Sequence, residues 1–121
     1  MPHVIVHFDP KRVLQSVIDE LKPPLQQIVA DGLSYTSSDH KDVRVDPKEV
    51  YVRQQAAHPT DVNPAAIEIE IQAGKKRERN PEGMVVLMSR KIIESEIIPK
   101  DMADLCIWLR FSEDNAFKNI Y

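Results

Sequence analysis

Residues 1–8 have the sequence MPHVIVHF, in which Val4-Ile5-Val6 and Phe8 form a β-branched and aromatic run. Such a run predicts a buried strand that starts at the N-terminus. Pro2 is small enough for the initiator methionine to be removed, which leaves a proline with a free secondary amine. Inside the protein body, burial and nearby cations disfavour the protonated amine, so its pKa falls toward neutrality. A general base works best at such a pKa, and Pro2 is therefore the first candidate catalytic residue.

An inconsequential Met-Pro start is the alternative, because many chains begin with this dipeptide. If Met1 is retained, the nitrogen of Pro2 is an amide with no basicity, and the general-base hypothesis fails for that form of the protein.

The composition is that of an ordinary globular domain, and we expect a single domain over residues 1–121. The chain has 42% hydrophobic and 29% charged residues and a net charge of −3, which provides no global attraction to nucleic acid or anionic membranes. No apolar run approaches the roughly 20 residues of a membrane helix, and no signal peptide is recognisable. Cys106 is the one cysteine, so neither an internal disulfide nor a zinc cluster is expected. We expect a cytoplasmic protein without a cofactor or metal.

The first half of the chain predicts a strand, a helix and a second strand. Asp9-Pro10 resembles an N-cap followed by proline at the first helical position. Apolar residues at helical spacing follow, and we expect this helix to be kinked or split at Pro23-Pro24. Residues 34–41 are polar and predict a surface loop. In the extended segment that follows, alternation places Tyr51 and Arg53 on one face.

The second half repeats this order. Residues 65–73 (AAIEIEIQA) alternate isoleucine with polar residues, which predicts a strand with one buried face. A basic loop, Lys75 to Arg79, leads to Asn80-Pro81, which repeats the capping pattern of a helix expected to run to about Ile97. Residues 105–111 (LCIWLRF) predict the last strand.

Pro2 and Pro64 each precede a strand and stand 62 residues apart, so the pattern indicates a tandem β-α-β repeat with halves of about 1–62 and 63–121. The predicted fold class is α+β, a four-stranded mixed sheet with two helices on one face. Pro64 cannot be a second catalytic amine, because its nitrogen lies in a peptide bond.

These features together resemble the tautomerase superfamily, in particular its long-chain members of the type of 5-carboxymethyl-2-hydroxymuconate isomerase and macrophage migration inhibitory factor. The resemblance rests on the strand that begins at Pro2, the tandem repeat, the length, and three short stretches: Met1 to Val6, Ile71 to Lys75, and Asn115 to Lys118. It implies a homotrimer with active sites near subunit contacts. It also implies an N-terminal proline that moves a proton within a small enol or keto carboxylic acid, with cationic side chains binding the carboxylates.

Carried over to this sequence, the resemblance implies that Pro2 is the catalytic residue. The substrate-binding arginine of the family aligns best with Tyr51, and Arg53 lies two residues further on the same face. The arginine of the loop after the third strand falls on Lys75. Tyrosine and lysine still bind anions, but without the bidentate fork of arginine.

The leading hypothesis is therefore a tautomerase or isomerase acting on a small carboxylic acid, with Pro2 as general base and Arg53, Tyr51 and Lys75 as substrate-binding candidates. A related hypothesis gives Pro2 a role in hydrating or decarboxylating an unsaturated acid. The alternative from another class is a non-catalytic oligomeric or small-ligand-binding protein on the same fold. Cys106 is expected to be a core or interface thiol, and Trp108 a core or subunit contact.

Overall fold

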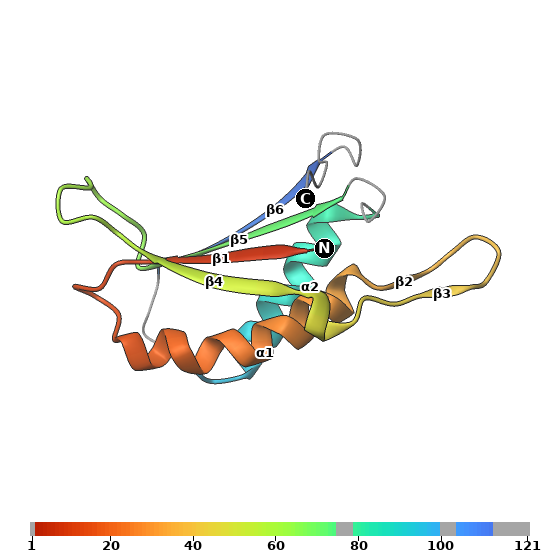
Figure 1. Ribbon diagram of the computed structural model, residues 1–121, viewed down its shortest axis with the longest axis horizontal. Coiled ribbons are helices and arrows are strands. Elements are labelled where there is room, and N and C mark those ends of the chain that lie inside the picture. Colours follow the sequence, from red (N-terminus) through yellow and green to blue (C-terminus); the bar gives the residue numbers. More distant parts are fainter. Residues whose placement is uncertain (1, 75–78, 100–103, 113–121) are drawn as a thin grey trace, which may run out of the picture.

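A computed structural model of the chain describes residues 2–74, 79–99 and 104–112 (Figure 1). In chain order, its elements are β1 (His3–Phe8), α1 (Gln15–Leu33), β2 (Tyr35–Thr36), β3 (Asp42–Val43), the 3₁₀ helix η1 (Pro47–Glu49), β4 (Tyr51–Ala56), β5 (Ile67–Gly74), α2 (Pro81–Glu94) and β6 (Leu105–Ser112).

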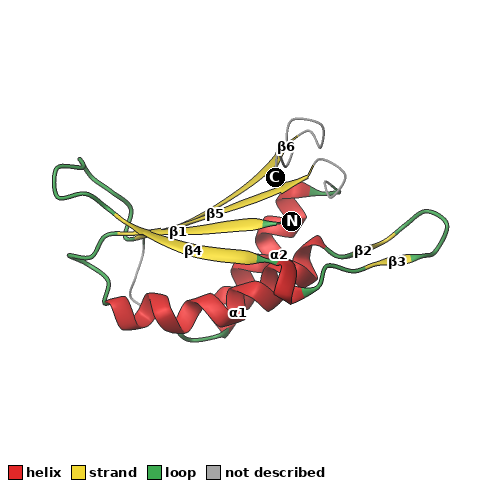
Figure 2. Ribbon diagram, in the orientation of Figure 1, coloured by secondary structure: helices red, strands yellow, loops and turns green. Residues whose placement is uncertain are grey.

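The main sheet has four strands in the order β4-β1-β5-β6. The outer pairs, β1 with β4 and β5 with β6, are parallel, while the central pair of β1 and β5 is antiparallel. Both helices lie on one face of this sheet (Figure 2). Each parallel pair is joined through one helix, so the sheet contains the units β1-α1-β4 and β5-α2-β6. The predicted α+β class, with a mixed four-stranded sheet and two helices on one face, is confirmed.

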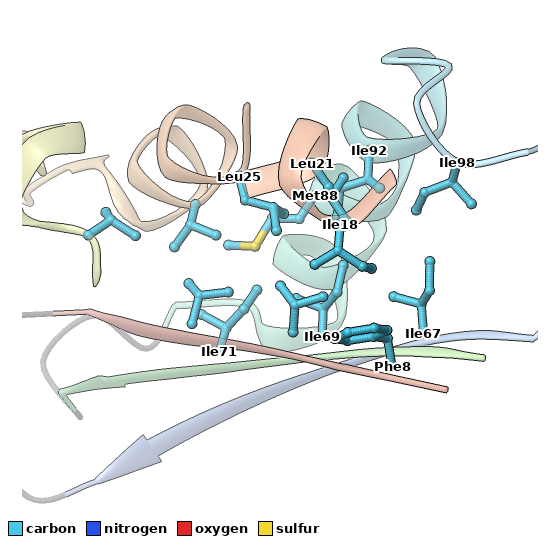
Figure 3. Close-up of a cluster of buried hydrophobic side chains, with 14 of the residues drawn as sticks. Phe8, Ile18, Leu21, Leu25, Ile67, Ile69, Ile71, Met88, Ile92 and Ile98 are labelled. Atoms are coloured by element: carbon cyan, nitrogen blue, oxygen red, sulfur yellow. The ribbon is translucent and has the colours of Figure 1, made fainter. Parts of the chain in front are cut away.

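The core lies between the sheet and the helices, and Figure 3 shows the facing side chains. Ile67, Ile69 and Ile71 of β5 are fully buried because period-two alternation turns all three toward the helices. Buried side chains of α1 (Ile18, Leu21 and Leu25) and of α2 (Met88 and Ile92) meet them from the other layer. The opposite face of the sheet carries the alternate residues, which are mainly polar. We call it the outer face.

The first helix differs from its prediction in where it begins and in being continuous, while a kink at Pro23-Pro24 stays a prediction. It begins at Gln15 rather than at Asp9-Pro10, because Asp9 forms a turn in which its side chain accepts a hydrogen bond from the Lys11 amide. The Asp9 amide donates to the carbonyl of Ala66 at 3.0 Å, which ties this turn to the entry of β5. The N-cap is Leu14, whose side chain makes no capping bond.

The helix is also not split at Pro23-Pro24 but runs unbroken through both prolines. Each proline lacks the N–H that would bond to the residue four positions earlier, here Asp19 and Glu20. Asp19 and Glu20 are exposed, so water can bind the carbonyls that lose their partner. Burial of Leu21, Leu25 and Val29 then supplies the packing that keeps the helix continuous.

The second helix begins as predicted. The Asn80 side chain accepts a hydrogen bond from the Gly83 amide, and Pro81 occupies the first turn, where it loses no helical bond. α2 packs closely against the end of α1: a Cβ built on Gly32 would lie 2.3 Å from Cε of Met88. Gly32 is therefore a position where the absence of a side chain permits the contact between the helices.

Residues 34–41, predicted as a surface loop, include the two residues of β2, which pair with β3 just after this segment in a short hairpin. The loop prediction is therefore wrong for Tyr35 and Thr36. The hairpin projects from the body of the molecule (Figure 1). Its base is fixed because Ser34 Oγ donates to the carbonyl of Ala30 at 2.7 Å and accepts from the Val45 amide at 2.9 Å. Among the residues described, none of the helices has the length and apolar character needed to span a membrane.

Candidate active site

Pro2 is buried at the entry of β1, one of the two central strands. Its carbonyl accepts a hydrogen bond from the Tyr51 amide at 3.0 Å, so it lies beside the start of β4. On the other side, the pairing of His3 with Gln72 places it near the end of β5. Alternation along β1 puts Pro2 on the helix-covered side with Val4. The first candidate residue thus occupies an interior position at one end of the sheet.

Tyr51 and Arg53 gather around His3 on the outer face. The pairing of β1 with β4 sets His3 opposite Tyr51, and their ring centroids are 5.1 Å apart with a tilt of 47°. Arg53 Nε donates to His3 Nε2 at 3.1 Å. Tyr51 is 54% exposed, whereas Arg53 is half-buried. The structure therefore brings the two substrate-binding candidates together, on the side of the sheet opposite to Pro2. The third candidate, Lys75, lies outside the described residues.

A second polar group on the outer face centres on Glu70. The amide of Gln72, which donates to Glu70 at 2.8 Å, lowers the pKa of the Glu70 carboxyl. Burial opposes that shift, while His7, 3.4 Å away, and Arg110, 3.7 Å away, lower the pKa further. Glu70 is thus held as a carboxylate between two cationic or polar neighbours. The sequence predicted the polar face of β5. It did not predict the side chains that surround Glu70, which are His7 of β1 and Arg110 of β6.

The predicted core positions of Cys106 and Trp108 in β6 are wrong, because both side chains lie on the outer face. Cys106 is exposed, because it points to the outer face and not into the core. Trp108 is 51% exposed on that face, with the Arg110 guanidinium 5.9 Å from its ring centroid. A core position is wrong for both side chains, and contact with another subunit stays a prediction. Within the described ranges, no group of three or more His, Cys, Asp or Glu is arranged to hold a metal.

Cavities of several sizes indent the described surface. One of 170 Å³ lies at the far end of β1 from Pro2 and includes Asp61 and Glu68. A groove of 510 Å³ between α2 and β6 is lined by apolar residues and one serine, Ser89. The third, of 240 Å³, lies between the end of α1 and the start of α2. We call this third space the helix-end cavity.

The helix-end cavity contains an arginine held on an aromatic ring. Arg79 Cζ lies 3.7 Å from the ring centroid of Tyr35, and both residues line the cavity. Sequence reasoning grouped Arg79 with a basic loop and assigned Tyr35 to a polar surface loop. Residues 44 positions apart cannot be recognised as partners from their spacing. The one signal in the sequence was the aromatic side chain of Tyr35 within an otherwise polar stretch.

No family model matches the sequence, and no curated protein matches it. Solved structures do match the fold. An asymmetric trimer of wild-type fused 4-OT has a TM-score of 0.68 at 10% identity, covering 98% of this chain and 92% of the other. A symmetric trimer of wild-type fused 4-OT has a TM-score of 0.64 at 13% identity, covering 98% and 91%.

A macrophage migration inhibitory factor-like protein from Entamoeba histolytica has a TM-score of 0.64 at 7% identity, covering 99% of this chain and 96% of the other. At such identities the likeness shows the fold alone. The predicted resemblance is confirmed at that level: the chain has the fold of the fused 4-OT and macrophage migration inhibitory factor-like proteins.

Proposed function

We propose that this chain of tautomerase fold is an isomerase that moves a proton within a small enol or keto carboxylic acid, with the amine of Pro2 as the general base. The observation that carries the proposal is the buried position of Pro2 at the entry of a central strand of this fold. Removal of Met1 converts its nitrogen from an amide to a secondary amine. Burial disfavours the charged form of that amine, which makes it a base near neutral pH.

The reaction needs only a base and positive charge. The Pro2 amine takes the proton of the enol hydroxyl or of the carbon next to the carbonyl, and the resulting ammonium returns a proton to the other atom of the conjugated system. Between these steps, negative charge develops on an oxygen of the substrate. Arginine and lysine side chains stabilise that charge and bind the carboxylate, and a tyrosine hydroxyl donates one further hydrogen bond. We therefore assign substrate binding to Arg53, Tyr51 and Lys75.

Oligomerisation belongs to the same proposal. Tyr51 and Arg53 lie on the outer face, away from the side that covers Pro2, so within one chain they do not face the amine from the same side of the sheet. Exposed Tyr51 and Trp108 give the outer face apolar surface that a neighbouring copy can cover. The two fused 4-OT structures compared above are trimers. We assign this chain to a homotrimer in which these side chains complete the site of a neighbouring Pro2.

The test combines intact mass with turnover. Phenylenolpyruvate and 2-hydroxymuconate serve as enol substrates, and Pro2→Ala is compared with Pro64→Ala, which changes the corresponding residue of the second half. We expect loss of Met1 from the wild type, and a fall of about 10²- to 10⁴-fold in kcat/KM for Pro2→Ala but not for Pro64→Ala. Full retention of Met1, or equal turnover in both variants, would refute the role of Pro2 and favour a small-ligand-binding protein.

A further inference from the structure

We infer that His3 is a positioning residue for Arg53, and that it holds the guanidinium only while its own imidazole is neutral. His3 thereby regulates the proposed site, and this role rests on the assignment of substrate binding to Arg53 under the proposed function. Three features of the outer face support it: the direction of one hydrogen bond, the charges around that bond, and a second histidine on the same strand that bonds in the opposite sense.

The register of β1 and β4 brings the Arg53 side chain to His3. β1 lies between β4 and β5, and His3 is paired with Tyr51, two residues before Arg53 (Figure 1). A residue two positions along the neighbouring strand lies on the same face and is within reach of a long side chain. Arg53 Nε and His3 Nε2 are 3.1 Å apart, and the ring centroids of His3 and Tyr51 are 5.1 Å apart. The aromatic contact restrains the imidazole, so the arginine meets an acceptor of defined position.

The hydrogen bond between Arg53 and His3 has only one possible direction. Every N–H of a guanidinium is a donor, and arginine stays charged at any pH that the folded protein tolerates, so Nε2 of His3 is the acceptor. Nε2 has a free lone pair only in the neutral imidazole that carries its proton on Nδ1. Protonation of His3 therefore removes the acceptor and places a second positive charge beside the guanidinium. The contact then changes from a hydrogen bond to a repulsion.

His7, on the same face of β1, bonds in the opposite sense. Its Nε2 lies 3.4 Å from Oε1 of Glu70, and the pKa of that carboxyl is lowered, most strongly by the amide of Gln72. A carboxylate only accepts hydrogen bonds, so Nε2 of His7 is the donor, and it remains a donor when the ring is protonated. Protonation thus opens the contact of His3 and preserves that of His7, although the two histidines lie on one strand.

No unengaged carboxylate of the described residues faces His3. The facing side chains of β4 are Tyr51 and Arg53. Those of β5 are Gln72, which is paired with His3, and Glu70 at the next position of the same face. Glu70 is already hydrogen-bonded to Gln72 at 2.8 Å and to the second histidine. A proton on His3 therefore acts directly on the guanidinium beside it.

The bond to His3 uses Nε and leaves the two terminal nitrogens of Arg53 for a ligand. A carboxylate can bridge these nitrogens when the guanidinium is held in one orientation, and a restrained side chain loses less entropy on binding. Repelled by protonated His3, Arg53 no longer has that orientation. Affinity for a substrate carboxylate should therefore fall on acidification, whereas every other protonation of the protein adds positive charge and strengthens anion binding.

The first experiment measures the hydrogen bond itself. NMR of the processed full chain records the imidazole and guanidinium nitrogens between pH 5 and 8, the range in which histidine side chains ordinarily change charge. We expect neutral His3 to carry its proton on Nδ1 and neutral His7 to carry it on Nε2. The Arg53 Nε–H should lose its protection from exchange as His3 is protonated. A neutral His3 with its proton on Nε2, or an Arg53 signal that ignores the state of His3, would overturn the inference.

The second experiment measures the consequence for binding. The probe is cinnamate, which has the carbon skeleton of phenylenolpyruvate without the enol and stays ionised over this range; titration calorimetry gives its Kd. His3→Gln supplies an amide oxygen that accepts from Nε at every pH, His3→Leu has no acceptor, and His7→Gln is the matched control. Wild type and His7→Gln should lose affinity about tenfold from pH 8 to pH 5, as loss of a hydrogen bond to a charged group implies. His3→Gln should keep its affinity throughout, and His3→Leu should bind weakly at both ends.

The same pH dependence in His3→Gln and in the wild type would overturn the positioning role. A wild type that does not bind cinnamate, or that binds it more tightly at pH 5, would overturn it as well. Intact mass establishes that each variant has lost Met1, because position 3 lies next to the processing site, and matching unfolding profiles exclude a folding defect.

Turnover of phenylenolpyruvate by the same proteins tests the proposed isomerase separately. At pH 8, His3→Leu should raise KM about tenfold and change kcat much less, because His3 acts through binding by Arg53. Equal loss of kcat and kcat/KM in His3→Leu with an unchanged KM would contradict the positioning role. Absence of turnover by the wild type would count against the isomerase, while the NMR and cinnamate results would still decide the role of His3.

Discussion

The contact between Gly32 and Met88 yields a quantitative prediction about how the two helices pack. A Cβ at Gly32 would lie 2.3 Å from Cε and 2.9 Å from Cγ of Met88, whose side chain is only 1% exposed. Overpacking of this kind costs about 1–3 kcal/mol. Alanine instead of glycine in a helix recovers about 1 kcal/mol. Gly32→Ala should therefore lower the free energy of unfolding by about 1 kcal/mol.

The sign should reverse when the obstruction is removed. A Met88→Ala background removes the three heavy atoms nearest to the new methyl group, so Gly32→Ala should raise the free energy of unfolding by up to about 1 kcal/mol. The coupling energy between the two sites is then about 1–3 kcal/mol. Met88→Ala itself costs about 2–5 kcal/mol, which a domain with 5–15 kcal/mol of stability tolerates.

Urea unfolding followed by circular dichroism, at one protein concentration, measures all four proteins of this double-mutant cycle. A common m-value is needed for the comparison. If Gly32→Ala changed the free energy of unfolding equally in both backgrounds, to within about 0.5 kcal/mol, the sites would be independent and the packing argument would be wrong.

Two further predictions concern the caps and turns that position the second half. The Ala66 amide and then Arg12 lower the pKa of the Asp104 carboxyl, so its stabilising effect should be complete above about pH 4 and lost as the pH falls further. Asp104→Asn should therefore flatten the acid side of the stability profile in urea titrations; an unchanged slope below pH 4 would contradict this. Asn80→Ala removes the bond to the Gly83 amide and should cost about 1 kcal/mol, measured by thermal unfolding, and a change below a few tenths would contradict the cap.

The sheet was predictable because its strands carry strong local patterns. Alternation in residues 67–73 identifies the buried face of β5 without any tertiary information, and burial in the structure follows it. Asn80-Pro81 was a correct helix start because the capping side chain and the Gly83 amide that donates to it are close in sequence. These features depend on local chemistry, which a single sequence contains.

Other features depend on partners distant in the chain. Asp9-Pro10 resembled a helix start, but a hydrogen bond to Ala66 uses the Asp9 amide in a turn instead. Continuity of α1 through Pro23-Pro24 depends on the packing of its buried side chains, which propensity does not include. The same limit applied to the candidate site.

The shared face of Tyr51 and Arg53 follows from alternation, whereas the bond from Arg53 to His3 requires the register of β1 with β4. Arg79 and Tyr35 are separated in the chain by β4 and β5, and no pattern of residue spacing predicts that the two side chains meet.

The most direct test of the central claim changes only the chemical state of the Pro2 nitrogen. One alanine inserted between Met1 and Pro2 keeps every side chain but converts the amine of the processed protein to an amide. The measurement is kcat/KM for enol-to-keto conversion by the extended chain and by the processed wild type, with identical unfolding profiles as the control. The general-base account predicts a fall of about 10²-fold or more in the extended chain. Equal kcat/KM in the two proteins would show that the amine is not the base.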